Sequence, residues 1–131
     1  MTAKVLFTGK TQITSGPDGA ARSTNGVLDI KLPQPHPAAE NLFGAAWSAC
    51  YLGALELAAS QRKIALPTHL SVDAEIALNL DGSAFFLSAR LNVSIPGLDR
   101  EIAEGLLHAA HEICPYSKAV KGNVDVVTTL A

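Results

Sequence analysis

The feature that most constrains the fold is an uncharged run, Leu42–Leu55, inside a longer segment from Glu40 to Arg62. Ala, Leu and Glu dominate this segment, so its composition favours a helix. Apolar side chains occupy every face of that helix, which is typical of a helix buried all round, in a protein or in a bilayer. The fourteen uncharged residues are fewer than the roughly 20 that a membrane-spanning helix needs, and Glu56 follows them. We therefore predict a central core helix wrapped by the rest of the fold, with no membrane partner.

Length and composition indicate one domain, residues 1–131, that hides apolar surface in an oligomer. A chain of 131 residues suits a single core. Hydrophobic residues make up 48% of the chain and charged residues only 17%, which is a lean surface for a small monomer. The net charge of -2 gives no electrostatic footprint for nucleic acid. The N-terminal residues show no signal-peptide pattern, so the expected location is the cytoplasm.

Three strands are predicted ahead of the core helix. Residues 4–14 are rich in β-branched and aromatic types and predict the first strand. Turn-forming residues at 15–19 and the pair Asn25-Gly26 separate it from two further strands, the last of which alternates over residues 27–32. The proline-rich segment 33–37 predicts an ordered crossover loop into the helix.

A long hairpin is predicted after the core helix. Apolar and polar residues alternate over Leu70–Leu80 and again over Phe85–Ile95, and the pair Asp81-Gly82 lies between them as a turn. This pattern indicates one buried and one solvated face.

Two helices and a strand are predicted at the C-terminal end. Asp99 is a candidate N-cap for an amphipathic helix that ends at Cys114, because the residue before a proline is driven out of helical geometry. A short helix is expected from Pro115, and a last strand from Val124 to Leu130. Strands and helices segregate along the chain, so we predict an α+β fold in which an antiparallel sheet packs on the buried helix.

Cys50 and Cys114 are the two cysteines of the chain, 64 residues apart. In a reducing compartment such a pair suggests redox chemistry, but free cysteines also pack as small, inert apolar residues. Burial in mid-helix keeps a thiol protonated, so a reactive Cys50 needs a positive partner, whereas Cys114 gains some favourable field from the helix that starts at Pro115. Which thiol reacts stays open on these grounds.

Glu40 and Arg22 are the candidate charged partners of a reactive thiol. On a straight helix Glu40 lies about 15 Å from Cys50 along the axis. A functional Glu40 therefore needs a bend in the helix or a neighbouring subunit, and otherwise it only favours the helix dipole. Arg22 follows the turn at residues 15–19, while Arg90 and Arg100 are expected on the surface.

His108, His111 and Cys114 recur at intervals of three residues, which places them near one another on a helix. Zinc sites use a fourth protein ligand or a carboxylate, and none accompanies them. We interpret the histidines as proton-sharing or surface residues, and no metal site is predicted. Phosphate-binding glycine loops, a CxxC pair and a serine-hydrolase context are all missing from the sequence.

Two cysteine motifs and two flanking segments follow one known pattern. The core-helix motif comprises Glu40–Phe43 and Ala46–Leu55, the second motif comprises Ala110-His111, Cys114–Ala119 and Gly122–Val126, and the flanking segments are Gly26–Leu32 and Pro96–Arg100. Over essentially its whole length the chain thus resembles the Ohr branch of the Ohr/OsmC family, the organic hydroperoxide resistance proteins.

The resemblance implies an OsmC-like fold, an intertwined homodimer in which antiparallel sheets wrap the two central helices. It also implies a peroxidase in which Cys50 attacks an organic or lipid hydroperoxide, releases the alcohol and becomes a sulfenic acid. Cys114 then resolves this acid as a disulfide, and Glu40 and an arginine belong to the same site. The implied reductant is dihydrolipoamide or a lipoylated protein, and no metal, haem or flavin cofactor is implied.

The sequence departs from the family pattern at the arginine. The family carries it in the glycine turn, where this chain has Pro17, and Arg22 lies five residues further on. The segment that leads into Glu40 is also shorter than the family's. Without the arginine, the Cys50 thiolate loses electrostatic support. The alternative is therefore a family member with weak peroxidase activity that binds an apolar ligand or senses redox state.

Overall fold

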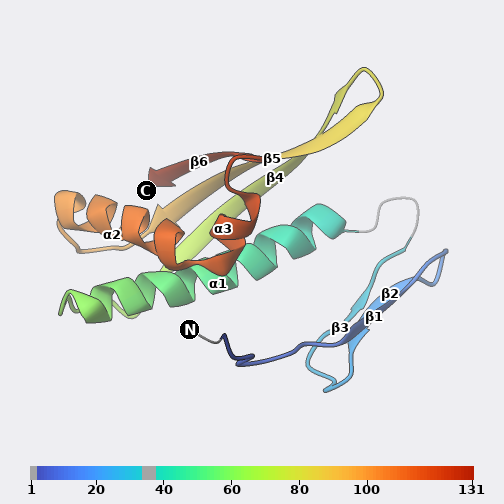
Figure 1. Cartoon of the computed structure of the whole chain (residues 1–131), viewed down its shortest axis with the longest axis horizontal. Helices are drawn as coiled ribbons and strands as arrows, with labels where there is room; N and C mark the ends of the chain where they lie inside the picture. Colours follow the sequence, from blue (N-terminus) through green and yellow to red (C-terminus); the bar gives the residue numbers. More distant parts are fainter. Residues whose placement is uncertain (1–2, 34–37) are drawn as a thin grey trace. The chain divides into compact units, whose positions relative to one another are not determined.

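The computed structural model describes residues 3–33 and 38–131 (Figure 1). The chain forms two compact units, Met1–Ala39 and Glu40–Ala131, each with its own internal packing. The predicted loop at 33–37 lies mostly outside the described residues. The assignment of one domain to residues 1–131 stays a prediction.

The first unit is a three-stranded meander, as predicted. Strands β1 (Thr11–Thr14), β2 (Ala20–Ser23) and β3 (Asp29–Lys31) pair antiparallel in that order. The predicted first strand is wrong over residues 4–10, which are not in a strand. No strand of the described residues pairs with this segment. The β-propensity of its side chains reflects packing against cross-strand neighbours, which are missing there. Val5, Leu6 and Phe7 are 81%, 85% and 78% exposed.

The core helix is α1, Ala39–Gln61, as its composition predicts. The prediction of burial on every face is wrong for the single chain, because one stripe alone is buried: Gly44, Trp47, Tyr51, Ala54, Leu55, Ala58 and Ala59. The helix is long and apolar enough to cross a membrane. However, this stripe packs into the protein core, and its large side chains are fully buried. Gly44 permits close packing, since a Cβ there would lie 3.3 Å from side-chain atoms of Ala74 and Ile76.

The second sheet has the order β4-β5-β6. Strands β4 (Ser71–Asp81) and β5 (Ala84–Ser94) form the predicted antiparallel hairpin, whose loop extends beyond the rest of the unit (Figure 1). Strand β6 (Asp125–Leu130) pairs with β5 in parallel. The prediction of a purely antiparallel sheet is therefore wrong. Two helices connect β5 to β6, and such a crossover returns the chain in the direction of the strand it left.

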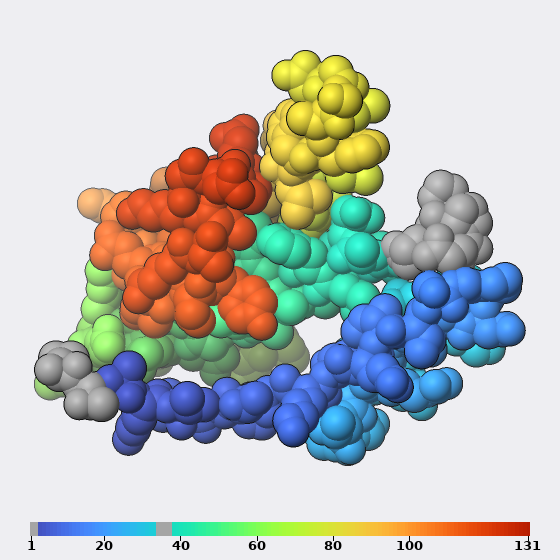
Figure 2. All heavy atoms as spheres, turned by 45° about the vertical axis from the view of Figure 1, so that its right-hand side comes forward, coloured from blue at the N-terminus to red at the C-terminus, as the bar shows by residue number. Residues whose placement is uncertain are grey.

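Helices α2 (Arg100–Ile113) and α3 (Pro115–Val120) form this crossover. Asp99 is the predicted N-cap of α2, and its carboxylate accepts a hydrogen bond from the Glu101 backbone N–H. Figure 2 shows α2 and α3, in orange and red, covering the middle of α1. The core of this unit lies between these three helices and the sheet, and its largest fully buried side chains are Trp47, Tyr51, Leu55, Leu91, Leu106 and Val93.

Candidate functional site

The two cysteine sulfurs lie together. Cys50 is partly exposed in the middle of α1, and Cys114 is fully buried between α2 and α3. Pro115 forces Cys114 into an extended conformation (φ -64°, ψ 117°), so the chain turns there and α3 lies against α1. The Cys114 thiol donates a hydrogen bond to the Cys50 sulfur at 3.4 Å. Both thiols are free and close enough for a disulfide to form with a small movement.

The surroundings of Cys50 favour its protonated form within this unit. Burial raises the pKa of the Cys50 thiol, and the hydrogen bond from Cys114 adds to this effect. The Tyr116 backbone N–H, in the first turn of α3, hydrogen-bonds to the Cys50 sulfur and opposes the rise in its pKa. A reactive thiolate therefore needs a positive charge besides this N–H group.

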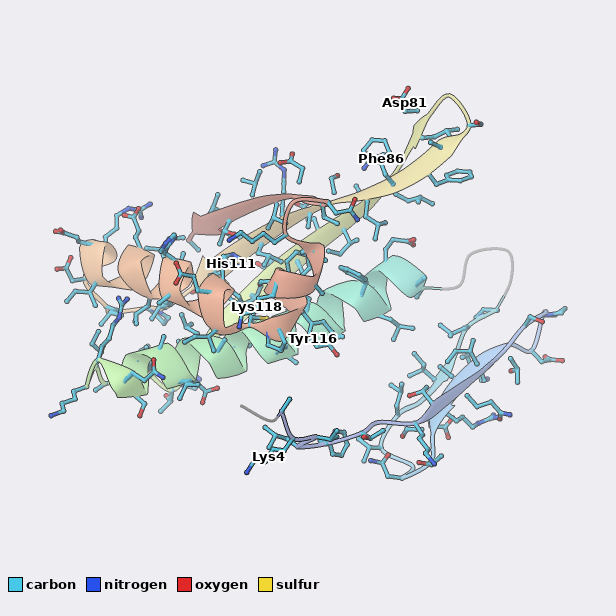
Figure 3. All side chains as sticks on the ribbon, in the orientation of Figure 1. Lys4, Asp81, Phe86, His111, Tyr116 and Lys118 are labelled. Carbon is cyan, nitrogen blue, oxygen red and sulfur yellow. The ribbon has the colours of Figure 1, made fainter. Side chains whose placement is uncertain are left out.

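A series of buried and partly buried hydrogen bonds lies next to the sulfur pair. The Trp47 indole N–H donates to the Ser117 hydroxyl at 3.0 Å. His111 bonds with one ring nitrogen to Ser117 at 2.8 Å and with the other to the Thr128 hydroxyl at 2.7 Å. The His111 ring also stacks at a tilt on Tyr51, with 4.6 Å between ring centroids. In Figure 3, His111 lies where α2 meets α3 and β6.

Glu40 lies on the same helix as Cys50, and α1 runs unbroken between them. Ten residues of helix separate the two groups by about 15 Å, so the predicted alternative of a bend is wrong. Glu40 instead lines a groove of about 560 Å³ between the first half of α1 and β4, together with Gly44 and Ser48. The buried Ser48 hydroxyl in this groove has no hydrogen-bond partner among the described residues. Of the two alternatives for a functional Glu40, the neighbouring subunit remains.

Arg22 lies in β2 of the first unit, and Cys50 belongs to the second. Its guanidinium forms an exposed ion pair with Asp29 at 3.1 Å across the β2–β3 pair. Pro17 occupies the turn between β1 and β2, which Gly19 closes with a backbone hydrogen bond to Gly16. Within each unit, then, the structure brings the two thiols together but places neither Glu40 nor Arg22 beside them.

The histidines of α2 have separate environments. His108 faces solvent and bonds to Glu112 at 3.1 Å, whereas both ring nitrogens of His111 bond to hydroxyl groups. In the ranges 3–33 and 38–131, no three His, Cys, Asp or Glu side chains gather as metal ligands.

Sequence reasoning missed Trp47, Ser117, Thr128 and the Tyr116 N–H. A signal was present, because Trp47 precedes Cys50 by three residues and Ser117 follows Cys114 by three, so each lies one helical turn from a sulfur. The pairing itself depends on the approach of α1 and α3, which no local pattern encodes.

Comparisons with known proteins agree with this architecture. The family described as OsmC-like protein matches residues 32–129. The organic hydroperoxide resistance protein of Xanthomonas axonopodis pv. citri is 36% identical, over 98% of this chain and 96% of that protein. The crystal structure of the organic hydroperoxide resistance protein OhrB of Bacillus subtilis superposes with a TM-score of 0.87 at 37% identity, over 97% of this chain and 100% of that one.

A second crystal structure also shares this fold. It is a protein of Vibrio cholerae described as an organic hydroperoxide resistance protein, with captopril bound in one of its active sites. It is 27% identical with a TM-score of 0.85, over 99% of this chain and 95% of that one. The family match, the full-length relatives and the shared fold together establish that this chain belongs to the Ohr/OsmC family of OsmC-like proteins.

Proposed function

We propose that this protein is a cysteine-based peroxidase that reduces organic hydroperoxides to alcohols. Relatives that align over nearly the whole chain are named for organic hydroperoxide resistance. The observation that carries the proposal is the sulfur pair, in which a partly exposed Cys50 lies 3.4 Å from a fully buried Cys114. An accessible thiol backed by a sheltered second thiol suits a two-step redox reaction.

In the first step the Cys50 thiolate attacks the outer oxygen of the hydroperoxide. The O–O bond breaks, the alkoxide takes a proton and leaves as the alcohol, and Cys50 becomes a sulfenic acid. In the second step the Cys114 sulfur attacks the Cys50 sulfur, and the hydroxyl leaves as water. The protein has then given two electrons to the peroxide and holds a Cys50–Cys114 disulfide.

Activation of Cys50 is assigned to a cation from outside its own unit. The raised pKa of Cys50 means that the Tyr116 N–H alone does not support the thiolate. We assign this role to Arg22, which is 66% exposed in its ion pair with Asp29 and so gives up little stability on changing partner. Glu40 of a neighbouring subunit would orient such an arginine through a carboxylate–guanidinium bond.

A homodimer is part of the proposal. The single chain leaves large apolar side chains exposed in both units, among them Phe7, Val27, Phe85 and Phe86. An exposed apolar surface of this kind marks an interface between subunits. The opposite face of α1, with exposed Ala45, Ala49 and Gly53, offers small side chains for close packing of a second helix.

The proposal needs an external dithiol and no resident cofactor. Dihydrolipoamide, free or on a lipoylated protein, would attack the disulfide, form a mixed disulfide and close its own ring as both cysteines return to thiols. The cytoplasm, where thiols are kept reduced, is the location that suits this cycle.

The test is consumption of an alkyl hydroperoxide by the purified protein with dihydrolipoamide, beside Cys50→Ser, Arg22→Ala and Pro17→Arg variants. Turnover that Cys50→Ser abolishes and Arg22→Ala weakens supports both the peroxidase and the role of Arg22. Full hydroperoxide consumption by Cys50→Ser would refute the proposal.

A second candidate, a family member that binds an apolar ligand or senses redox state, is favoured by one observation. Burial raises the pKa of Cys50, and Pro17 stands at the apparent position of the family's arginine. Slow turnover that Pro17→Arg accelerates would support this candidate, since a cation in the β1–β2 turn would then restore a missing function.

A further inference from the structure

We infer that the hydrogen-bonded chain Trp47–Ser117–His111–Thr128 positions Cys114 for attack on the Cys50 sulfur, and that His111 is its central positioning residue. The inference deepens the proposed function, because it concerns the step that closes the disulfide. None of these four residues forms a hydrogen bond to Cys50 or Cys114 among the described residues. They therefore position the sulfurs through the helices that carry the cysteines.

These hydrogen bonds join the three helices α1, α2 and α3 to strand β6. Trp47 belongs to α1, Ser117 to α3, His111 to α2 and Thr128 to β6, and each bond measures 2.7–3.0 Å. Trp47 is 0% exposed and Ser117 7%. The buried Trp47–Ser117 bond costs much more to break than an exposed one, because the freed donor finds no water, and the two bonds of His111 are partly buried.

The sequence positions of Trp47 and Ser117 place their hydrogen bond close to the two sulfurs. Trp47 lies three residues before Cys50 on α1, and Ser117 lies three residues after Cys114, at the start of α3. The Trp47–Ser117 bond therefore ties together the two helical turns that carry the sulfurs, next to the 3.4 Å sulfur contact.

One hydrogen-bond direction in this series is fixed by the donor type. The indole N–H can only donate, so the Ser117 oxygen accepts from Trp47. The Ser117 hydroxyl can donate to the His111 Nδ1 atom while Nε2–H donates to Thr128, or it can accept from Nδ1–H while the Thr128 hydroxyl donates to Nε2. Both neutral tautomers of His111 therefore keep all three bonds.

The test follows the closure of the disulfide with an aromatic disulfide reagent that releases a coloured thiolate. The Cys50 thiolate attacks the reagent, forms a mixed disulfide and releases one coloured thiolate. The Cys114 thiolate then attacks the Cys50 sulfur, forms the protein disulfide and releases the second. The first phase depends on reagent concentration and the second does not. Cys114→Ser, which releases one equivalent, identifies the phases.

Matched variants separate positioning from general loosening. His111→Gln is compared with His108→Gln, which changes the same residue type on the same helix at an exposed site. Thr128→Val removes the hydroxyl with little change in shape. Its control is Thr129→Val, at the next residue of β6, where the hydroxyl donates an exposed hydrogen bond to Asn92 of β5. Should His111→Gln fail to fold, Thr128→Val carries the test, because its site is only partly buried.

We expect His111→Gln and Thr128→Val to slow the second phase on the order of ten-fold or more, since small displacements of reacting groups cost large factors in rate. The first phase and both control variants should keep the rates of the unaltered protein. Second-phase rates equal to those of the controls would overturn the inference. The assay needs no hydroperoxide, so it tests the inference separately from the proposed function. If disulfide closure is slowed by the variants but the unaltered protein consumes no hydroperoxide, only the proposed function is refuted. If closure is unchanged in a protein that is an active peroxidase, only this inference is refuted.

Discussion

The two units of the chain bury their apolar residues differently. In the second unit Trp47, Leu55, Leu91 and Leu106 are 0% exposed, and both cysteines belong to this core or pack against it. In the first unit Leu6 and Phe7 remain 85% and 78% exposed, and its sheet has strands of three or four residues. The sulfur pair thus forms in the packed core of the second unit, although Phe85 and Phe86 of the same unit are exposed. Arg22, the cation proposed to activate it, belongs to the first unit, whose buried hydrophobic residues are Ala20, Ala21 and Leu32.

The largest expected effect distinguishes the two thiols of the second unit. Cys50→Ser should abolish hydroperoxide consumption, because no other group of the pair is exposed for the first attack. Cys114→Ser should reduce one equivalent of hydroperoxide without added thiol, and with dihydrolipoamide it should turn over more slowly than the unaltered protein, because the reductant must then attack the Cys50 sulfenic acid in place of Cys114. Stopped-flow measurement of peroxide loss checks both variants. Turnover by Cys114→Ser as fast as that of the unaltered protein would remove the resolving role.

The second-largest expected effect is on the free energy of unfolding, which should respond differently to an apolar substitution in each unit. Leu55→Ala is expected to lower the free energy of unfolding by about 2–5 kcal/mol at every protein concentration, because it leaves a cavity in a packed core. Leu6→Ser removes a side chain that is exposed in the single chain, so we expect its stability to match the unaltered protein at low concentration, where both are monomers, and to fall below it at high concentration, where the interface forms. Chemical denaturation at several concentrations checks both. A loss for Leu6→Ser that does not change with concentration would contradict the comparison.

A smaller effect is expected on the reactivity of Cys50 when Arg22, which belongs to the other unit, is replaced. Arg22→Ala should raise the pKa of Cys50 further and slow its reaction about ten-fold at neutral pH, as the loss of one nearby cation does. Arg90→Ala, an exposed arginine on β5, is the control. The pH dependence of Cys50 alkylation measures the shift. Identical profiles for both variants would separate Arg22 from the site.

The smallest expected effect is a pH dependence within the second unit. Burial and then His108 lower the pKa of His111 below its usual 6.5. The unfolded chain therefore binds this proton at a higher pH than the folded one. Stability should fall as the pH drops through 6.5 and level off below the folded-state pKa. Besides His108, the groups near the ring are Tyr51, whose pKa burial raises, and Glu112, Lys118 and Lys121, which line the same pocket.

His111→Gln should remove this part of the pH dependence of stability, while His108→Gln should keep most of it. Thermal unfolding from pH 5 to 8 compares the two variants. A profile for His111→Gln that still falls below pH 6.5 would mean that another group titrates there.

The sequence predicted most elements because their signals are local. The hairpin, the Asp99 cap and the break at Cys114-Pro115 each follow from turn, cap or proline chemistry within a few residues. The direction of β6 was wrongly predicted, since it depends on the path of the α2–α3 crossover. Residues 4–10 carry β-forming side chains without a partner strand in the described structure. Propensity alone cannot supply that partner.

The candidate site also has parts that the sequence indicated and parts that it did not. The pairing of Cys50 with Cys114 came from the family resemblance, and the 3.4 Å contact supports it. The spacing of Ser117 from Cys114 indicates only that the two lie one helical turn apart, and the hydrogen bond from Trp47 depends on the approach of another helix. Arg22 and Glu40 stay predictions, since their partners lie outside the contacts within each unit.

The most direct test of the account is the mass of the protein after one equivalent of an alkyl hydroperoxide. The account predicts that the unaltered protein loses the mass of two hydrogen atoms and yields a Cys50–Cys114 cross-linked peptide, while Cys114→Ser gains one oxygen atom at Cys50. An unaltered protein that remains reduced, or one that is oxidised at a residue other than these two, would contradict it.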